Sequence, residues 1–172
     1  MKILIICGSR RKDSLTRKLT DIAFGYAKEK YEDVEYIDLG KKDMEPFRGF
    51  EEKYSNETME MVKLVESADV FIIGSPVYDA LLSSGVKNLF EFLNYKSLEK
   101  AVAGFIVKSN NPGTHQQVRG HLVALTNYFN ILSNPRPVFS IDDDFDEKGN
   151  LKNDKIKERI LNLVDSTVKL KR

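Results

Sequence analysis

Short apolar runs alternate along this chain with longer segments in which apolar residues recur at helical spacing. The first of the apolar runs, Lys2–Cys7, is nearly continuous. Such a run predicts a strand that is buried on both faces of a sheet, because the run leaves no polar face for solvent. Later runs share this character, and Pro137 opens the last of them, where no hydrogen-bond donor is needed. The predicted strands are Lys2–Cys7, Val34–Leu39, Asp69–Gly74, Ala101–Lys108 and Pro137–Ile141.

The segments between these runs follow the helical period. After Ser14, apolar residues at positions 15, 19, 22, 23 and 26 fall on one face, which predicts an amphipathic helix with Ser14 as its N-cap. The same spacing predicts helices over Thr58–Ser67, Ser84–Leu93, Gln116–Leu132 and Asp154–Leu170. The charged segment Lys41–Ser55 predicts a surface loop.

Strands that alternate with helices predict an α/β fold, with a parallel sheet covered by helices on both faces. Such folds have two common strand orders, and in both of them ligands bind beyond the carboxyl ends of the strands. The loops after the first, third and fourth strands begin at Gly8, Gly74 and Lys108, so we expect the functional site there. No repeat or linker divides the chain, and we expect one domain over residues 1–172.

The composition restricts the class of protein further. With 172 residues, 41% of them hydrophobic, the chain is typical of a globular protein with a sizeable core. Its net charge of +1 gives no strong basic field, so we expect neither nucleic acid nor an anionic membrane as a partner. The single cysteine, Cys7, excludes an internal disulfide and a cysteine-rich metal site, and it favours a cytoplasmic location. The apolar start is too short for a signal peptide, and no segment approaches the ~20 apolar residues of a membrane span.

The loop after the first strand, Gly8–Thr16, has the residues of an anion site. A helix that begins after Ser14 presents backbone N–H groups without helical partners, and such an N-terminus attracts anions. Hydroxyl groups of Ser9, Ser14 and Thr16 can donate to phosphate oxygens, and Arg11 can add a charge-assisted contact. From these residues alone, a solvated basic turn with a capped helix is an equal alternative.

Two common phosphate motifs are absent. The pattern G-x-x-x-x-G-K-[ST] does not occur, which argues against a P-loop NTPase. Arg10 and Asp13 stand where a dinucleotide-binding G-x-G-x-x-G would have glycine. Asp38, at the end of the second strand, has the place of a ribose-binding acid, although an ordinary strand-end carboxylate is the better interpretation.

The other two loops are less specific by themselves. Pro76 is predicted to end the pairing of the third strand, so that Val77 and Tyr78 project at the carboxyl edge of the sheet, where a flat ring can pack. The polar segment Lys108–Gln117 has amides that can meet the polar edge of such a ring, but its Asn-Pro-Gly sequence is also ordinary turn chemistry.

At these loops the chain resembles the NADPH-dependent FMN reductases, flavodoxin-like proteins that include quinone, chromate and azo-dye reductases. Their first loop commonly reads G-S-x-R-x-x-S-x-N, which this chain matches at Gly8, Ser9, Arg11 and Ser14, with Thr16 in place of the asparagine. Their second loop commonly reads P-x-Y-n-x-x-x-x-x-x-[LV]-K-N, matched at Pro76, Tyr78, Val86, Lys87 and Asn88, with Asp79 where asparagine is frequent. The third loop departs from the glycine-rich family pattern.

The resemblance implies a flavodoxin-like three-layer sandwich with a five-stranded parallel sheet in the order 2-1-3-4-5. It implies an FMN-dependent oxidoreductase that takes hydride from NADPH or NADH and passes electrons to free flavin or a quinone-like small molecule, as a homodimer or homotetramer. We expect no catalytic side chain, because the cofactor supplies the chemistry. The implied FMN contacts are Ser9, Arg11, Ser14, Leu15 and Thr16 at the phosphate, Pro76, Val77, Tyr78 and Asp79 along the ring, and Ser109, Asn110, Asn111, Gly113 and His115 on the third side.

Other candidate sites are weaker. His115 and His121 do not share a helix face as a metal-binding pair would, and we expect His121 on the surface and Cys7 in the core. The acidic segment Asp142–Asn153 lacks the glycine and the final glutamate of a calcium loop, which predicts a solvated turn. We therefore expect no metal.

Two other functions stay open. One is a flavodoxin-type electron carrier that binds FMN without efficient NAD(P)H oxidation, although such carriers tend to be strongly acidic and this chain is nearly neutral. The other is an α/β nucleotide-binding protein without flavin.

Overall fold

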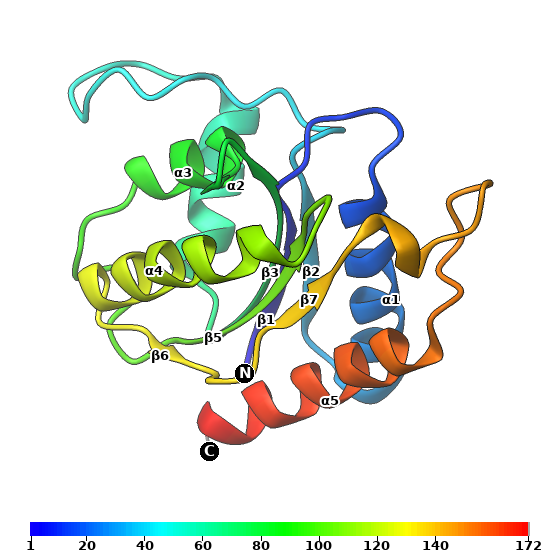
Figure 1. Cartoon of the computed structure of the whole chain (residues 1–172). Coiled ribbons are helices and arrows are strands. Elements are labelled where there is room, and N and C mark those ends of the chain that lie inside the picture. Colours follow the sequence, from blue (N-terminus) through cyan, green and yellow to red (C-terminus); the bar gives the residue numbers. More distant parts are fainter. Residues whose placement is uncertain (172) are drawn as a thin grey trace.

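A sheet of parallel strands forms the centre of the fold (Figure 1), and the computed structural model describes residues 1–171. β1 (Ile3–Cys7) lies between β2 (Val34–Asp38) and β3 (Val70–Tyr78), and β3 pairs on its other side with β5 (Val102–Lys108). Two short strands, β6 (Leu132–Ser133) and β7 (Val138–Ser140), share the edge position of the sheet next to β5 and pair with opposite ends of it. The predicted strand order is therefore confirmed, and β6 and the short hairpin strand β4 (Leu81–Leu82) are additions to it.

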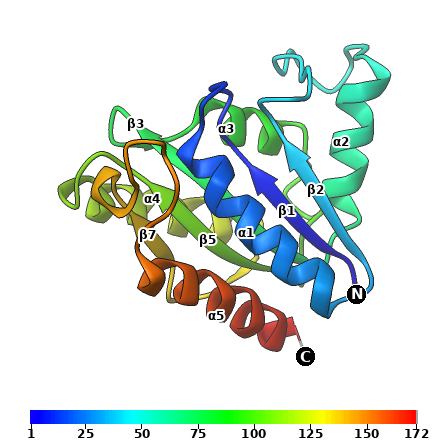
Figure 2. The same cartoon turned by 90° about the vertical axis from the view of Figure 1, so that its right-hand side faces the viewer.

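Helices cover both faces of this sheet, which gives three layers (Figures 1 and 2). Alternate residues along β1 account for the layers, because Ile3 and Ile5 belong to one hydrophobic cluster and Leu4 and Ile6 to the other. One face carries α1 (Leu15–Lys30) and α5 (Asp154–Lys171), and the other carries α2 (Asn56–Glu66), α3 (Ser84–Glu91) and α4 (Gly113–Tyr128). Among residues 1–171, no helix combines the length and the apolar composition of a membrane span.

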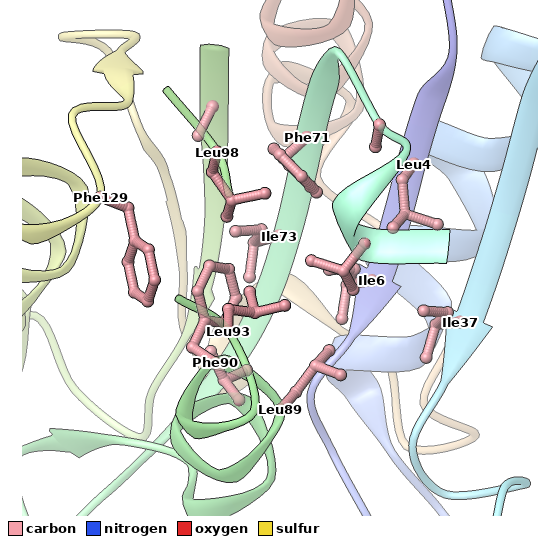
Figure 3. Close-up of a cluster of buried hydrophobic side chains, with 14 of the residues drawn as sticks. Leu4, Ile6, Ile37, Phe71, Ile73, Leu89, Phe90, Leu93, Leu98 and Phe129 are labelled. Atoms are coloured by element: carbon pink, nitrogen blue, oxygen red, sulfur yellow. The ribbon is translucent and has the colours of Figure 1, made fainter. Parts of the chain in front are cut away.

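Figure 3 shows the hydrophobic cluster between the sheet and the layer of α2, α3 and α4. Phe71 of β3 is fully buried there, and Leu89, Phe90 and Leu93 of the α3 region pack against the strands as the helical spacing predicts. Burial of each such side chain contributes about 1.5–3 kcal/mol, so this face fixes α3 at the carboxyl end of the sheet. Leu170, the end of the predicted last helix, lies on the last turn of α5 and is 38% exposed.

β3 is longer than its apolar pattern predicts. The prediction that Pro76 ends its pairing is wrong, since Pro76 stands opposite Lys108 and β3 continues to Tyr78. The last residue pair between β1 and β3 is Cys7 with Gly74, so beyond Gly74 the strand has a parallel partner only on the β5 side. An edge of this kind tolerates a residue without an N–H group.

α4 starts and ends earlier than predicted. It covers Gly113–Tyr128, so Gly113 and His115 lie in its first turn rather than in the preceding loop. Pro112 precedes the helix with a φ of −64°, a conformation suited to a helix start. Asn130 has a φ of 53° and ends the helical path before Leu132, which enters β6.

The acidic segment after β7 folds back on itself through a short 3-10 turn, Asp142–Asp144. The carboxylate of Asp144 accepts hydrogen bonds from Ser140 Oγ at 2.9 Å, Ile141 N at 2.9 Å and Asn153 Nδ2 at 2.6 Å. Burial by itself raises the pKa of Asp144, but these hydrogen bonds outweigh burial and lower it. The prediction of a solvated turn is therefore wrong for Asp144, whose buried carboxylate organises the segment.

Candidate functional site

The loops after β1 and β3 meet through backbone contacts at the carboxyl end of the sheet. Gly8 N donates to Gly74 O at 2.7 Å, and Ser83 Oγ donates to Gly8 O at 2.7 Å. A Cβ atom on Gly8 would lie 2.2 Å from Val86 Cγ2 and 2.9 Å from Gly74 O, which is too close for any side chain. Glycine at position 8 thus allows the first loop to pack directly on the second.

The first loop leads into a capped helix, as predicted. Ser14 Oγ accepts a hydrogen bond from Arg17 N at 3.1 Å, which makes Ser14 the N-cap of α1. Ser9 and Thr16 are buried with exposed fractions of 1% and 2%, while Arg11 is exposed and Leu15 is half-buried. All five residues predicted at the phosphate therefore lie in one continuous segment, which follows β1 and runs into the first turn of α1.

The backbone at the start of α1 presents a group of free donors. Within residues 1–171, no hydrogen bond uses the N–H groups of Lys12, Asp13, Ser14, Leu15 and Thr16. The N-terminus of a helix also carries a partial positive charge. Successive N–H groups at such an end, together with nearby hydroxyls, form a site for a phosphate-sized anion.

The second loop forms a tight hairpin instead of an open loop. β3 turns into β4 through Asp79 and Ala80, whose φ values are 49° and 63°. Neither residue is a glycine, and a positive φ costs such a residue about 1–3 kcal/mol, so the surrounding hairpin holds this turn in place. Tyr78 is 40% exposed at the edge of the sheet as predicted, whereas Val77 is half-buried against the α2–α4 layer and Pro76 is buried.

Several polar groups of the third loop form hydrogen bonds with one another. Ser109 Oγ lies 2.8 Å from His115 Nε2 and donates to Asn111 O at 2.8 Å, and Asn111 Oδ1 accepts from Gly113 N at 2.9 Å. The His115 ring stacks on Phe139 with 4.5 Å between ring centroids. Burial lowers the pKa of His115, although the Asp144 charge and the Ser140 carbonyl act against it. Of the polar side chains predicted on this side, Asn110 and Asn111 are exposed, and those of Ser109, Asn111 and His115 hold the loop itself together.

Polar residues outside the predicted set also support the site. Lys108 is buried at the end of β5, where its ammonium group donates to Ser109 O at 3.0 Å and pairs with Asp142. Asn88 accepts from Phe47 N at 2.8 Å and donates to Glu45 O at 2.9 Å, so it ties α3 to the surface loop 41–55. The family motif quoted above includes Asn88, but its contacts involve a segment far away in sequence and could not be read from spacing.

An apolar groove of about 640 Å³ lies beside the site, between α3 and α4. Leu81 and Leu82 of the hairpin form part of its wall, and Phe50 and Tyr128 contribute exposed aromatic rings. His121 also lines it, and its Nδ1 atom is buried without a hydrogen-bond partner within residues 1–171. His121 is thus a half-buried residue of α4 that lines this open groove, rather than a fully solvated one.

Together these features fit a phosphorylated ligand with a flat ring. Free N–H groups and hydroxyls at α1 suit the phosphate, and the hairpin with Tyr78 borders the same end of the sheet. The sheet end lies at the change of strand order between β1 and β3, where open α/β folds bind their ligands.

Comparison with protein families gives a match to the family described as NADPH-dependent FMN reductase over residues 1–146. The chain is 28% identical over 135 residues to an NAD(P)H-dependent FAD/FMN reductase of Geobacillus thermodenitrificans, covering 76% of this chain and 71% of that protein. It is 30% identical over 125 residues to an FMN-dependent NADPH-azoreductase of Staphylococcus saprophyticus, covering 67% of this chain and 66% of that protein.

Solved structures share the fold. An NADH:FMN oxidoreductase in its apo form superposes with a TM-score of 0.79 at 18% identity, covering 96% of this chain and 87% of that one. An NAD(P)H:(acceptor) oxidoreductase from Paracoccus denitrificans gives a TM-score of 0.75 at 19% identity, covering 99% of this chain and 96% of that one. These likenesses extend the match in fold to essentially the whole chain.

Proposed function

Because the chain belongs to the NADPH-dependent FMN reductase family, we propose that it is an FMN-dependent oxidoreductase formed by a single flavodoxin-like domain over residues 1–172. It takes hydride from NADPH or NADH and passes the electrons to free flavin or to a quinone-like small molecule. The observation that carries this proposal is the group of free N–H donors at the start of α1, from Lys12 to Thr16, because a phosphate monoester needs such donors.

The residues of the three loops contact different parts of the cofactor. Ser9, Ser14 and Thr16 donate hydroxyl hydrogen bonds to the phosphate, with the Leu15 N–H group and the Arg11 guanidinium beside them. The hairpin residues 76–79 border the ring, and the remaining side is closed by Ser109, Asn110, Asn111, Gly113 and His115. When bound, FMN supplies a hydride acceptor that also transfers electrons singly or in pairs.

The protein's own contribution is therefore placement and charge. Tyr78, at the edge of the sheet, provides an apolar face for the ring, while the carboxylate of Asp79, where it faces the ring, disfavours negative charge there. We assign no catalytic acid or base, since hydride transfer between two cofactors requires none.

A titration with FMN followed by anaerobic addition of NADPH or NADH tests this function. We expect the purified chain to bind FMN and either nucleotide to bleach the flavin absorbance within seconds. Failure to take up FMN would contradict the proposal. Bound FMN that neither nucleotide bleaches would instead identify an electron carrier, which the near-neutral net charge of +1 disfavours.

We propose further that the protein is a homodimer or homotetramer in the cytoplasm. Phe50, Leu81 and Tyr128, which are 68%, 51% and 65% exposed, surround the groove between α3 and α4 and form an apolar surface of the kind that a second copy covers. The free thiol of Cys7 suits a reducing compartment. A monomeric mass by light scattering, or recovery outside the cytoplasmic fraction, would contradict these two assignments.

A further inference from the structure

Arg17, in the first turns of α1, connects the first loop to the end of β2. Its Nε and Nη2 atoms donate to the two carboxylate oxygens of Asp38 at 2.6 Å and 3.2 Å. Its Nη1 atom donates to Arg11 O at 3.1 Å and to Lys12 O at 2.8 Å. One guanidinium group thus holds a carboxylate on one side and two loop carbonyls on the other.

Both partners of this ion pair are held firmly. The side chains of Arg17 and Asp38 are 12% and 7% exposed, and Asp38 Oδ1 also accepts from Gly40 N at 2.9 Å. A Cβ atom on Gly40 would lie 2.1 Å from Arg17 Nη2, which shows how closely the guanidinium packs on this turn. A fork-shaped, partly buried pair of this kind has a defined geometry, unlike a surface ion pair.

The direction of the two carbonyls determines the direction of two N–H groups. In a planar trans peptide the C=O and the following N–H point to opposite sides. Because the carbonyls of Arg11 and Lys12 point to Arg17, the N–H groups of Lys12 and Asp13 point away from it. These two N–H groups belong to the donors that have no acceptor within residues 1–171.

We propose that Arg17, anchored by Asp38, is a positioning residue that holds the first loop in its phosphate-binding conformation. This inference rests on the proposed function and assigns a role to two residues outside the predicted cofactor contacts. It also explains why Asp38 does not serve a ribose: its carboxylate is already occupied by the guanidinium and by Gly40 N.

The test compares FMN with riboflavin, which has the same ring and no phosphate. Arg17→Lys keeps the charge but loses the fork, and Asp38→Asn keeps one acceptor but loses the charge. We expect each variant to bind FMN at least about tenfold more weakly, with riboflavin affinity changed by less than about threefold. The double variant should lose no more FMN affinity than the weaker-binding of the two single variants loses, because the two residues act as one unit.

Asp165→Asn is the matched control. Asp165 accepts from Lys30, Tyr26 and Tyr31, so its loss also breaks a charged network on α1, but outside the loop. We expect this variant to change the unfolding midpoint and leave the FMN affinity unchanged. Two results would overturn this inference without affecting the proposed function. One is that Arg17→Lys and Asp38→Asn bind FMN as tightly as the unmodified protein does. The other is that they lose equal affinity for FMN and riboflavin. No FMN binding by the unmodified protein overturns the proposed function, and this inference with it.

Discussion

Ser14→Asp should weaken FMN binding by about a hundredfold or more while α1 keeps its cap. Aspartate caps a helix as well as serine does, so the hydrogen bond from Arg17 N is retained. Its carboxylate would, however, lie among the free N–H donors of the first loop and repel a phosphate dianion. Like charges about 4 Å apart repel by about 4 kcal/mol in a partly buried setting, so a hundredfold loss, about 2.7 kcal/mol, is a conservative expectation.

Ser14→Asn is the matched variant, because asparagine caps equally well and brings no charge. We expect it to bind FMN within about tenfold of the unmodified protein. Isothermal titration with FMN and with riboflavin measures both variants, and thermal unfolding checks that the cap is intact. Equal FMN affinity of the aspartate and asparagine variants would show that Ser14 does not face the phosphate.

Gly8→Ala should separate the first two loops. Its Cβ atom would meet Val86 Cγ2 at 2.2 Å and the backbone oxygen of Gly74 at 2.9 Å, so the surroundings must shift, and Gly74 O also accepts the bond from Gly8 N. Overpacking of this kind costs about 1–3 kcal/mol. For a protein of this size we expect the melting temperature to fall by roughly 2–4 °C per kcal/mol, and FMN affinity to fall with it.

Gly25→Ala is the control for the same chemical change. Gly25 lies on the exposed face of α1, and a Cβ atom there would have no neighbour within 4 Å. Alanine in an exposed helix stabilises by about 0.5–1 kcal/mol relative to glycine, so this variant should melt at a higher temperature. Differential scanning calorimetry should show a lower melting temperature for Gly8→Ala and a higher one for Gly25→Ala than for the unmodified protein. A Gly8→Ala variant as stable as Gly25→Ala would show that the first two loops do not pack closely at position 8.

The fold and the first loop were accessible from the sequence because they depend on local signals. Continuous apolar runs identify strands buried on both faces, and Ser14 precedes an apolar stripe at helical spacing. The extension of β3 through Pro76 was not accessible in this way. It depends on where the neighbouring strand β1 ends, which no property of the β3 segment reveals.

The supporting residues of the site could not be predicted for a related reason. Arg17 and Asp38 are far apart in the sequence and meet because β2 lies beside β1. The third loop has a similar feature: Ser109 and His115, the proposed FMN contacts on this side, also bond to each other, and spacing does not reveal that bond. Spacing predicts which residues face one end of the sheet, but not which of them satisfy one another.

The ratio of FMN to riboflavin affinity in the unmodified protein shows whether the free donors at the start of α1, between Lys12 and Thr16, hold the phosphate of FMN. The two ligands differ in the phosphate alone, so this ratio measures the contribution of the first loop. We predict that FMN binds at least about a hundredfold more tightly than riboflavin, and equal affinities would show that these donors do not bind the phosphate.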